Sequence, residues 1–337
     1  MNALQVMWGL LIGLILTVYL ILDGFDLGVG FWHLFTKRDS DRRSMLSAIM
    51  PYWDGNEVWL LTGGGAVFAA FPAVYATVFS GFYLAIMLLL FGLIFRAVAI
   101  EFRNQSESPR WRSAWDMAFG FGSVIPGLLF GVAAGNIVCG LPLDADGNYV
   151  GTFFDLLNPY SLLVGITGLA MFALHGAIFA TMKTQGELSA RAALWARSTV
   201  WVYLALLLAS IVVTAITQKG FMANYFAMPV LWVLPAVAVV ATALIGILSM
   251  TGAIWRAFLA SSVGILAVMA SLGAGLFPNM VPAINNPAYS LTLANASSSP
   301  LTLKTMLILA LVGVPIVIAY TAWVHTTFRG KVSDEAY

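Results

Sequence analysis

Long runs of apolar residues, separated by short polar stretches, follow one another along nearly the whole chain. Each run holds roughly 20 residues, which is the length that an α-helix needs to cross ~30 Å of hydrocarbon. The runs fall at about 4–35, 51–70, 73–101, 114–138, 158–182, 196–217, 228–250, 254–277 and 303–328. The pattern therefore predicts an all-α, polytopic membrane protein with about nine transmembrane helices, in which residues 1–337 form one integral membrane domain.

The composition agrees with this fold class. Of the 337 residues 61% are hydrophobic and only 9% are charged, and no long stretch is polar enough for a separate soluble domain. The single cysteine, Cys139, allows neither an internal disulfide nor a cysteine-based metal site. No phosphate-binding loop, dinucleotide fingerprint or catalytic triad pattern occurs. We expect no metal site, no catalytic residue and no nucleic-acid partner for this chain.

The basic residues are distributed unevenly between the loops. If the nine helices alternate in direction, all of the 16 Lys and Arg residues except Lys219 and Lys304 fall on one side. Cytoplasmic loops of membrane proteins carry such an excess of Lys and Arg. The distribution predicts that the N-terminus lies outside, in the periplasm of a bacterium, and that the C-terminus is cytoplasmic.

Four acidic residues lie inside expected helices, which is unusual in a membrane. They are Asp23 and Asp26 in the first run, and Asp54 and Glu57 in the first turns of the second. An ionisable group within a bilayer costs roughly 2.5–3.5 kcal/mol on insertion scales. One interpretation is structural: Asp54 favours a helix N-terminus, and Glu57 forms an ion pair with Arg96. The other is a proton path, because buried carboxyl groups can pass protons near neutral pH.

The three histidines do not form a cofactor site. His33 and His325 are expected near helix ends, and His175 lies within the fifth span. A haem between two axial histidines needs a pair at matched depth, and the sequence offers no such pair. A lone intramembrane histidine such as His175 is more often a hydrogen-bonded packing residue.

Other small and aromatic residues carry weaker signals. Trp53 and Trp59 flank the acidic turn and could shape a narrow path, although packing is the simpler interpretation.

Small residues spaced four apart let membrane helices approach closely. Such glycine pairs and triplets occur at Gly9/Gly13, Gly24/Gly28 and Gly127/Gly131/Gly135.

A series of longer motifs points to one family. In order, the chain contains DGFDLGVG, PYWDGNEVWLLTGGGAVFAAFPAVYATVFSGFY, RWRSAWD, GSVIPGLLFGVAAGN, FFDLLNPYSLLVGI with TQGEL, LFPNMVP and SLTLANASSSPLTL. This series, which spans almost the whole chain, resembles subunit II of the cytochrome bd family of quinol oxidases. The resemblance leaves open whether the chain belongs to the cyanide-insensitive branch.

The resemblance implies a concrete function. Enzymes of this family oxidise quinol and reduce dioxygen to water in the bacterial cytoplasmic (inner) membrane; they are electrogenic but do not pump protons. The two b-type haems and the d-type haem belong to subunit I, and subunit II is a haem-free relative packed against it. Each of the two subunits has two four-helix bundles plus one extra helix. Lipid, quinone and a small single-helix accessory subunit are further expected partners.

The resemblance also assigns roles to single residues. The Asp of WDGN, Asp54, is similar to a residue on a proton route toward the haems, and Asp26 is similar to a structural or proton-related residue. Trp59 is similar to a residue near an oxygen path at the subunit boundary, where we also expect Trp53. Glu57 stands where some members carry Gln, which adds an ionisable group beside Asp54.

Two other functions compete with this hypothesis. Buried acids, abundant glycine and the interrupted stretch LFPNMVPAINNP would suit a proton-coupled secondary transporter. No matching interrupted segment occurs in the other half of the chain. The second alternative is a purely structural assembly subunit, with all proton paths in subunit I.

Overall fold

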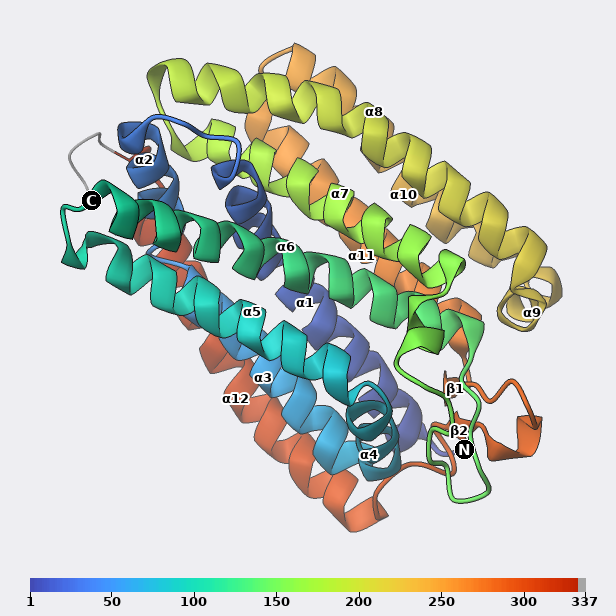
Figure 1. The fold of residues 1–337 in the computed structure, drawn as a ribbon. Helices are drawn as coiled ribbons and strands as arrows, with labels where there is room; N and C mark the ends of the chain where they lie inside the picture. Colours follow the sequence, from blue (N-terminus) through green and yellow to red (C-terminus); the bar gives the residue numbers. More distant parts are fainter. Residues whose placement is uncertain (333–337) are drawn as a thin grey trace.

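The fold is described from a computed structural model, whose described residues are 1–332. Helices make up nearly all of the structure (Figure 1). The helices are α1 (Ala3–His33), α2 (Asp39–Ile49), α3 (Trp53–Ala70), α4 (Pro72–Gly81), α5 (Tyr83–Phe102), α6 (Pro109–Cys139), α7 (Pro159–Lys183), α8 (Gly186–Thr217), α9 (Lys219–Ala227), α10 (Val233–Met250), α11 (Ile254–Leu276) and α12 (Pro300–Thr327). The strands β1 (Asn279–Val281) and β2 (Leu291–Thr292) pair antiparallel.

The long helices form two groups of four. Helices α1, α3, α5 and α6 make the first group, and α7, α8, α10 and α11 make the second. The groups are joined where α7 packs against α1 and α6, while α12 lies along the outer side of α3 and α1 (Figure 1). The predicted all-α fold with two four-helix bundles and one peripheral helix is confirmed.

The number of spans agrees with the sequence, but one boundary differs. Among the described residues, eight helices are long and apolar enough to cross a membrane, or up to nine if the bent pair α3–α4 counts as one span. The bend between α3 and α4 is 119°. Pro72 opens α4 and has no N–H with which to continue α3. The expected helix over 73–101 is therefore two elements, because the chain also breaks between α4 and α5 at Phe82.

Short elements occupy segments that we expected to be loops. Helix α2 forms because Asp39 pairs with Arg43 one turn later, while Met45, Leu46 and Ile49 are buried on one face. Helix α9 and the β1–β2 pair lie at the end of the helices that is opposite to α2 (Figure 1). Helices α6 and α8 also start five and ten residues earlier than expected, since their polar first turns project beyond the apolar part.

Glycines let the two groups of helices meet closely. A Cβ atom on Gly28 of α1 would lie 1.9 Å from the backbone oxygen of Phe172 on α7, and one on Gly176 would lie 2.3 Å from the backbone carbon of Gly28. Only glycine fits at either position. Gly13, in contrast, has no atom within 4 Å of such a Cβ, so the Gly9/Gly13 pair does not mark a helix contact inside this chain.

The two ends of the helices differ in charge. We call the end that carries loops 34–38, 103–108 and 184–185 the basic end; α2 and the last described residues also lie there (Figure 1). The N-terminus, α4, α9 and the strands lie at the opposite end. Lys219 begins α9 and Lys304 lies near the start of α12, both at that opposite end. The structure therefore reproduces the charge separation seen in the sequence.

Candidate functional site

Charged side chains meet inside the first four-helix group. We call this set the inner cluster; it consists of Tyr19, Asp23 and Asp26 on α1, Asn56 and Glu57 on α3, and Arg96 on α5. Asp23, Asp26 and Arg96 are fully buried. The sequence predicted acids at this depth, and the packing of three helices brings them around one arginine.

Arg96 is the centre of the inner cluster. Its Nη2 donates to Asp23 Oδ1 at 2.6 Å and to Glu57 Oε1 at 2.5 Å, and its Nη1 donates to Asp23 Oδ2 at 3.1 Å. Asp23 Oδ2 also accepts a hydrogen bond from the hydroxyl of Tyr19 at 2.9 Å. The ion pair expected between Arg96 and Glu57 is present, and Asp23, which sequence reasoning did not pair with Arg96, forms the bidentate pair.

Asp26 differs from Asp23 because it has no cationic partner among the described residues. Its Oδ2 accepts a hydrogen bond from Asn56 Nδ2 at 2.8 Å, and the same amide group donates to the backbone oxygen of Leu22. Asp26 Oδ1 is buried and has no hydrogen-bond partner within residues 1–332. One of the two oxygens of this carboxyl group is therefore not held by any donor of the described residues.

The inner cluster contains more acids than bases. The guanidinium of Arg96 pairs with two of the three carboxyl groups, those of Asp23 and Glu57. Glu57 is the one that reaches the surface, with 24% of its side chain exposed. An uncompensated charge in a low-dielectric interior is costly. A bound proton would balance the excess of carboxyl groups.

The structure places Asp54 apart from this cluster. Its side chain is exposed, on the outer face of α3. Trp53 is partly buried against Phe25 and its neighbours. Trp59 is buried against Ile15 and Tyr19, and its indole N–H has no partner among the described residues. The structure thus has Asp54 at the surface, Glu57 partly exposed and Asp26 buried. The path that we predicted through these three residues stays a prediction.

His175 is a packing residue, as expected. Its Nε2 donates to the backbone oxygen of Ile21 at 3.0 Å, so the proton of the neutral ring lies on Nε2. Nδ1 can then accept from the hydroxyl of Ser261 at 2.8 Å. Both ring nitrogens of His175 therefore take part in hydrogen bonds within the described chain.

A second charged cluster, which sequence reasoning missed, lies at the basic end. We call it the end cluster; it consists of His33, Asp39, Arg42, Arg43, Arg103, Arg112 and Asp116. Asp116 accepts from His33 Nε2 at 2.7 Å, from Arg42 Nη1 at 2.7 Å and from Arg103 Nε at 2.6 Å. Asp116 is the acid of the motif RWRSAWD, so a polar residue in an apolar helix was the available signal.

Asp39 closes the end cluster on the side of α2. Its Oδ1 accepts from Arg103 Nη2 at 2.6 Å. Partial burial alone raises the pKa of Asp39, but the hydrogen bond and charge of Arg103, together with the charges of Arg43 and Arg112, outweigh burial and lower this pKa below its usual value. The carboxylate is therefore ionised at neutral pH.

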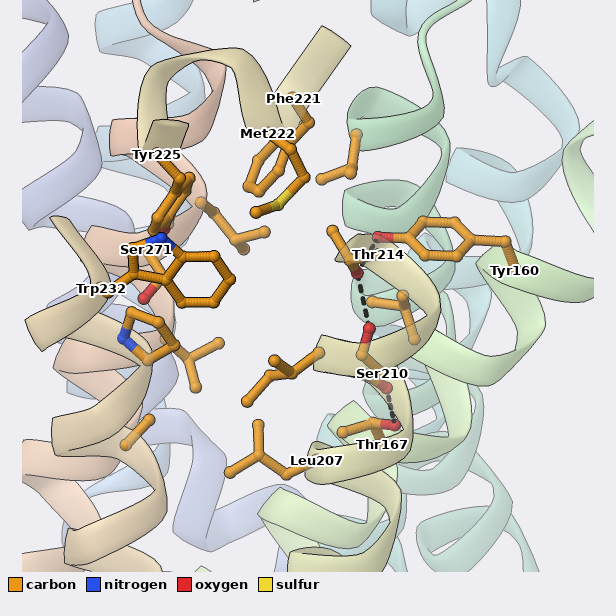
Figure 2. A pocket seen from close by; sticks show the side chains of 17 residues that line it. Tyr160, Thr167, Leu207, Ser210, Thr214, Phe221, Met222, Tyr225, Trp232 and Ser271 are labelled. Carbon is orange, nitrogen blue, oxygen red and sulfur yellow. Dashed lines mark hydrogen bonds between the residues drawn. The ribbon is translucent and has the colours of Figure 1, made fainter. Parts of the chain in front are cut away.

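The second four-helix group holds an apolar cavity instead of charges. The cavity has a volume of about 140 Å³ and lies between α7, α8, α10 and α11, beneath α9 (Figure 2). The hydroxyls on its wall are bonded to one another: Tyr160 to Thr214 at 2.8 Å, and Thr167 to Ser210 at 2.8 Å. With these hydroxyls paired, the cavity presents mainly carbon atoms.

Comparison with known proteins identifies the family. The chain matches the family described as cytochrome bd terminal oxidase subunit II over residues 4–328. The chain belongs to this family. A cytochrome bd terminal oxidase is an oxidoreductase complex, so this chain is a subunit of a respiratory oxidase. The transporter hypothesis has no support in these comparisons.

Relatives of this subunit II cover almost its full length. It is 39% identical to the cytochrome bd-I ubiquinol oxidase subunit 2 of Escherichia coli (strain K12), over 99% of this chain and 96% of that protein. It is 36% identical to the cytochrome bd ubiquinol oxidase subunit 2 of Bacillus subtilis (strain 168), over 99% and 98%. Together with the apolar helices, these bacterial relatives support a multi-pass protein of the bacterial inner membrane.

The fold of this subunit II is also found in a solved structure. It matches a chain of the bd oxidase from Geobacillus thermodenitrificans with a TM-score of 0.80 and 15% sequence identity, over 97% of this chain and 99% of that chain. At this identity the match shows the fold alone. Within residues 1–332 there is no group of three His, Cys, Asp or Glu side chains that could hold a metal ion.

Proposed function

We propose that this subunit II is the haem-free scaffold of a quinol-oxidising, dioxygen-reducing enzyme and that it supplies a proton path. The relatives are named as ubiquinol oxidase subunits. In this proposal two haems b and one haem d are held by subunit I, the protons come from the cytoplasm, and the basic end is the cytoplasmic side. The N-terminus is then periplasmic and the C-terminus cytoplasmic.

The unpaired oxygen of Asp26 is the observation that carries the proton path. A fully buried carboxylate oxygen without a partner is expensive unless the group exchanges a proton. Asp54 is exposed at the start of α3, and Glu57, one turn further in, is tied to Arg96. We propose that protons enter at Asp54, pass Glu57 and reach Asp26.

The exposed face of α3 and the apolar cavity have further proposed roles. We expect the face that carries Asp54 to meet subunit I, with Trp53 and Trp59 near the subunit boundary and Trp59 beside an oxygen path. Lipid, quinone and a small accessory subunit stay predicted partners. The cavity of Figure 2 is the place where a search for a bound apolar molecule should begin.

The test compares amide variants in the assembled oxidase. Asp26→Asn keeps the shape of the side chain but cannot carry a proton, so we expect turnover per haem to fall at least about tenfold, a barrier increase of ~1.4 kcal/mol. Asp54→Asn should reduce turnover less than Asp26→Asn does, and Glu57→Gln should have the mildest effect of the three. Oxygen consumption, normalised to haem content from the optical spectrum, is the measurement.

Asp146→Asn is the matched control, because Asp146 is exposed at the opposite end. Normal oxygen consumption in assembled Asp26→Asn and Asp54→Asn complexes would contradict the proposed proton path. It would leave the alternative in which subunit II is a purely structural assembly partner.

A further inference from the structure

A second group of polar side chains lies between the basic end and Asp26. Lys183, the last residue of α7, is buried and forms no ion pair with a carboxylate in the described chain. Its ammonium donates to the hydroxyl of Tyr52 at 2.6 Å, to the backbone oxygen of Phe328, and to that of Gly330 at 3.3 Å. The backbone that follows α12 is thereby held against α7.

Tyr52 links this group to a histidine. Its ring stacks on the ring of His325, with centroids 4.6 Å apart, and its hydroxyl donates to the backbone oxygen of Phe328 at 2.6 Å. The Tyr52 hydroxyl is thus a donor to Phe328 and an acceptor from Lys183. His325 Nε2 is buried and has no hydrogen-bond partner in residues 1–332.

Two cavities meet at Tyr52. The larger, about 230 Å³, opens at the basic end between Ser47, Lys183 and the segment after α12. The smaller, about 10 Å³, is lined by Tyr52, Asn56 and His325, and about 10–15 Å³ is what one water molecule needs. Asn56 is the residue whose amide holds Asp26. Polar groups and cavities therefore continue from the surface of the basic end to the buried carboxyl group.

We propose that Tyr52 and His325 form a second proton entry to Asp26, separate from Asp54. The inference rests on the proposed proton path. His325 takes up a proton at one ring nitrogen and releases one from the other, so that the neutral ring is restored and no charge remains. Tyr52 holds the imidazole in place through the stacked rings, and Lys183 positions Tyr52 and the segment after α12 at the mouth of the larger cavity. The ionisable groups next to His325 among the described residues are Tyr52 and Lys183.

The experiment uses the assembled oxidase with the His325→Ala variant. We expect turnover per haem to fall about tenfold, less than the 10²–10⁴ of a sole acid–base group, because the Asp54 entry remains. Free imidazole in the assay should restore turnover, which a purely structural role of His325 would not allow. Thr326→Ala is the neighbouring control, since Thr326 is exposed on α12. Tyr52→Phe keeps the stacked ring, removes the hydroxyl and should also slow turnover.

The outcomes separate this inference from the proposed function. Normal turnover of His325→Ala alongside impaired Asp26→Asn overturns the second entry and leaves the first path intact. A loss in His325→Ala that imidazole does not restore, together with normal Tyr52→Phe, also overturns it. Normal turnover of Asp26→Asn removes both proposals at once. Imidazole rescue of His325→Ala with slow Asp26→Asn supports the second entry.

Discussion

The inner cluster and the end cluster are built from the same residue types but have opposite charge balances. The inner cluster holds three carboxyl groups and one arginine, and Arg96 forms ion pairs with two of them, Asp23 and Glu57. In the end cluster four arginines and a histidine surround Asp39 and Asp116. Excess positive charge near a cytoplasmic loop fits the rule for membrane orientation. Excess negative charge inside the bundle fits no such rule, and our proposal of a proton path rests on this difference.

Stability alone does not explain the inner cluster. A buried ion pair often contributes little, because removing two charges from water costs about as much as their attraction returns. Among the described residues Asp26 forms no ion pair, and its only side-chain hydrogen-bond donor is Asn56. The comparison therefore predicts that amide variants of the inner carboxyl groups change turnover, whereas variants of the end cluster change stability without changing turnover.

The largest expected effect comes from removing the central cation. Arg96→Met leaves Asp23 buried without its partner, and breaking a buried pair in this way costs about 3–5 kcal/mol. We expect a low yield of assembled complex, a lower Tm and loss of haem bands from the optical spectrum. Arg110→Met is the control, because Arg110 is exposed and forms no ion pair in the described chain. If the Arg96→Met complex assembled with an unchanged Tm, the inner cluster would not need its cation.

A smaller effect is expected from the end cluster. Asp116→Asn keeps one acceptor oxygen but removes the negative charge between Arg42 and Arg103, at an expected cost of about 1–3 kcal/mol. The Tm should fall, while turnover per haem in the surviving complex should equal that of the parent. A drop in turnover per haem would show that the two clusters act as one unit and would break the comparison.

The smallest expected effect depends on pH. The pKa of Asp39 is lower in the folded chain than in the unfolded one, so its contribution to stability is present above an unfolded pKa of about 3.9 and disappears as the pH falls through the folded value. Asp39→Asn should lower the Tm slightly at pH 7. The difference should shrink below about pH 4. A constant difference at all pH values would mean that packing, and not the charge, is responsible.

Sequence reasoning located the acids but did not predict their partners. Asp23, Asp26 and Glu57 stand out because carboxyl groups are rare in membrane helices. Arg96 was paired with Glu57 on depth alone, and the structure adds Asp23. Asp116 was quoted within a motif but was given no role, because its partners are contributed by α1, α2 and the residues just after α5.

The sequence by itself determined the membrane class, the approximate spans, the separation of charge between the ends and the family. These features depend on local hydropathy and on motifs that can be read in order along the chain. Only the tertiary structure decided which carboxyl groups form ion pairs with Arg96 and that Asp54 faces outward. It also decided that Tyr52, Lys183 and His325 meet at the basic end. Such contacts depend on how the helices rotate and approach one another, which residues such as Gly28 and Gly176 permit and which no single helix encodes.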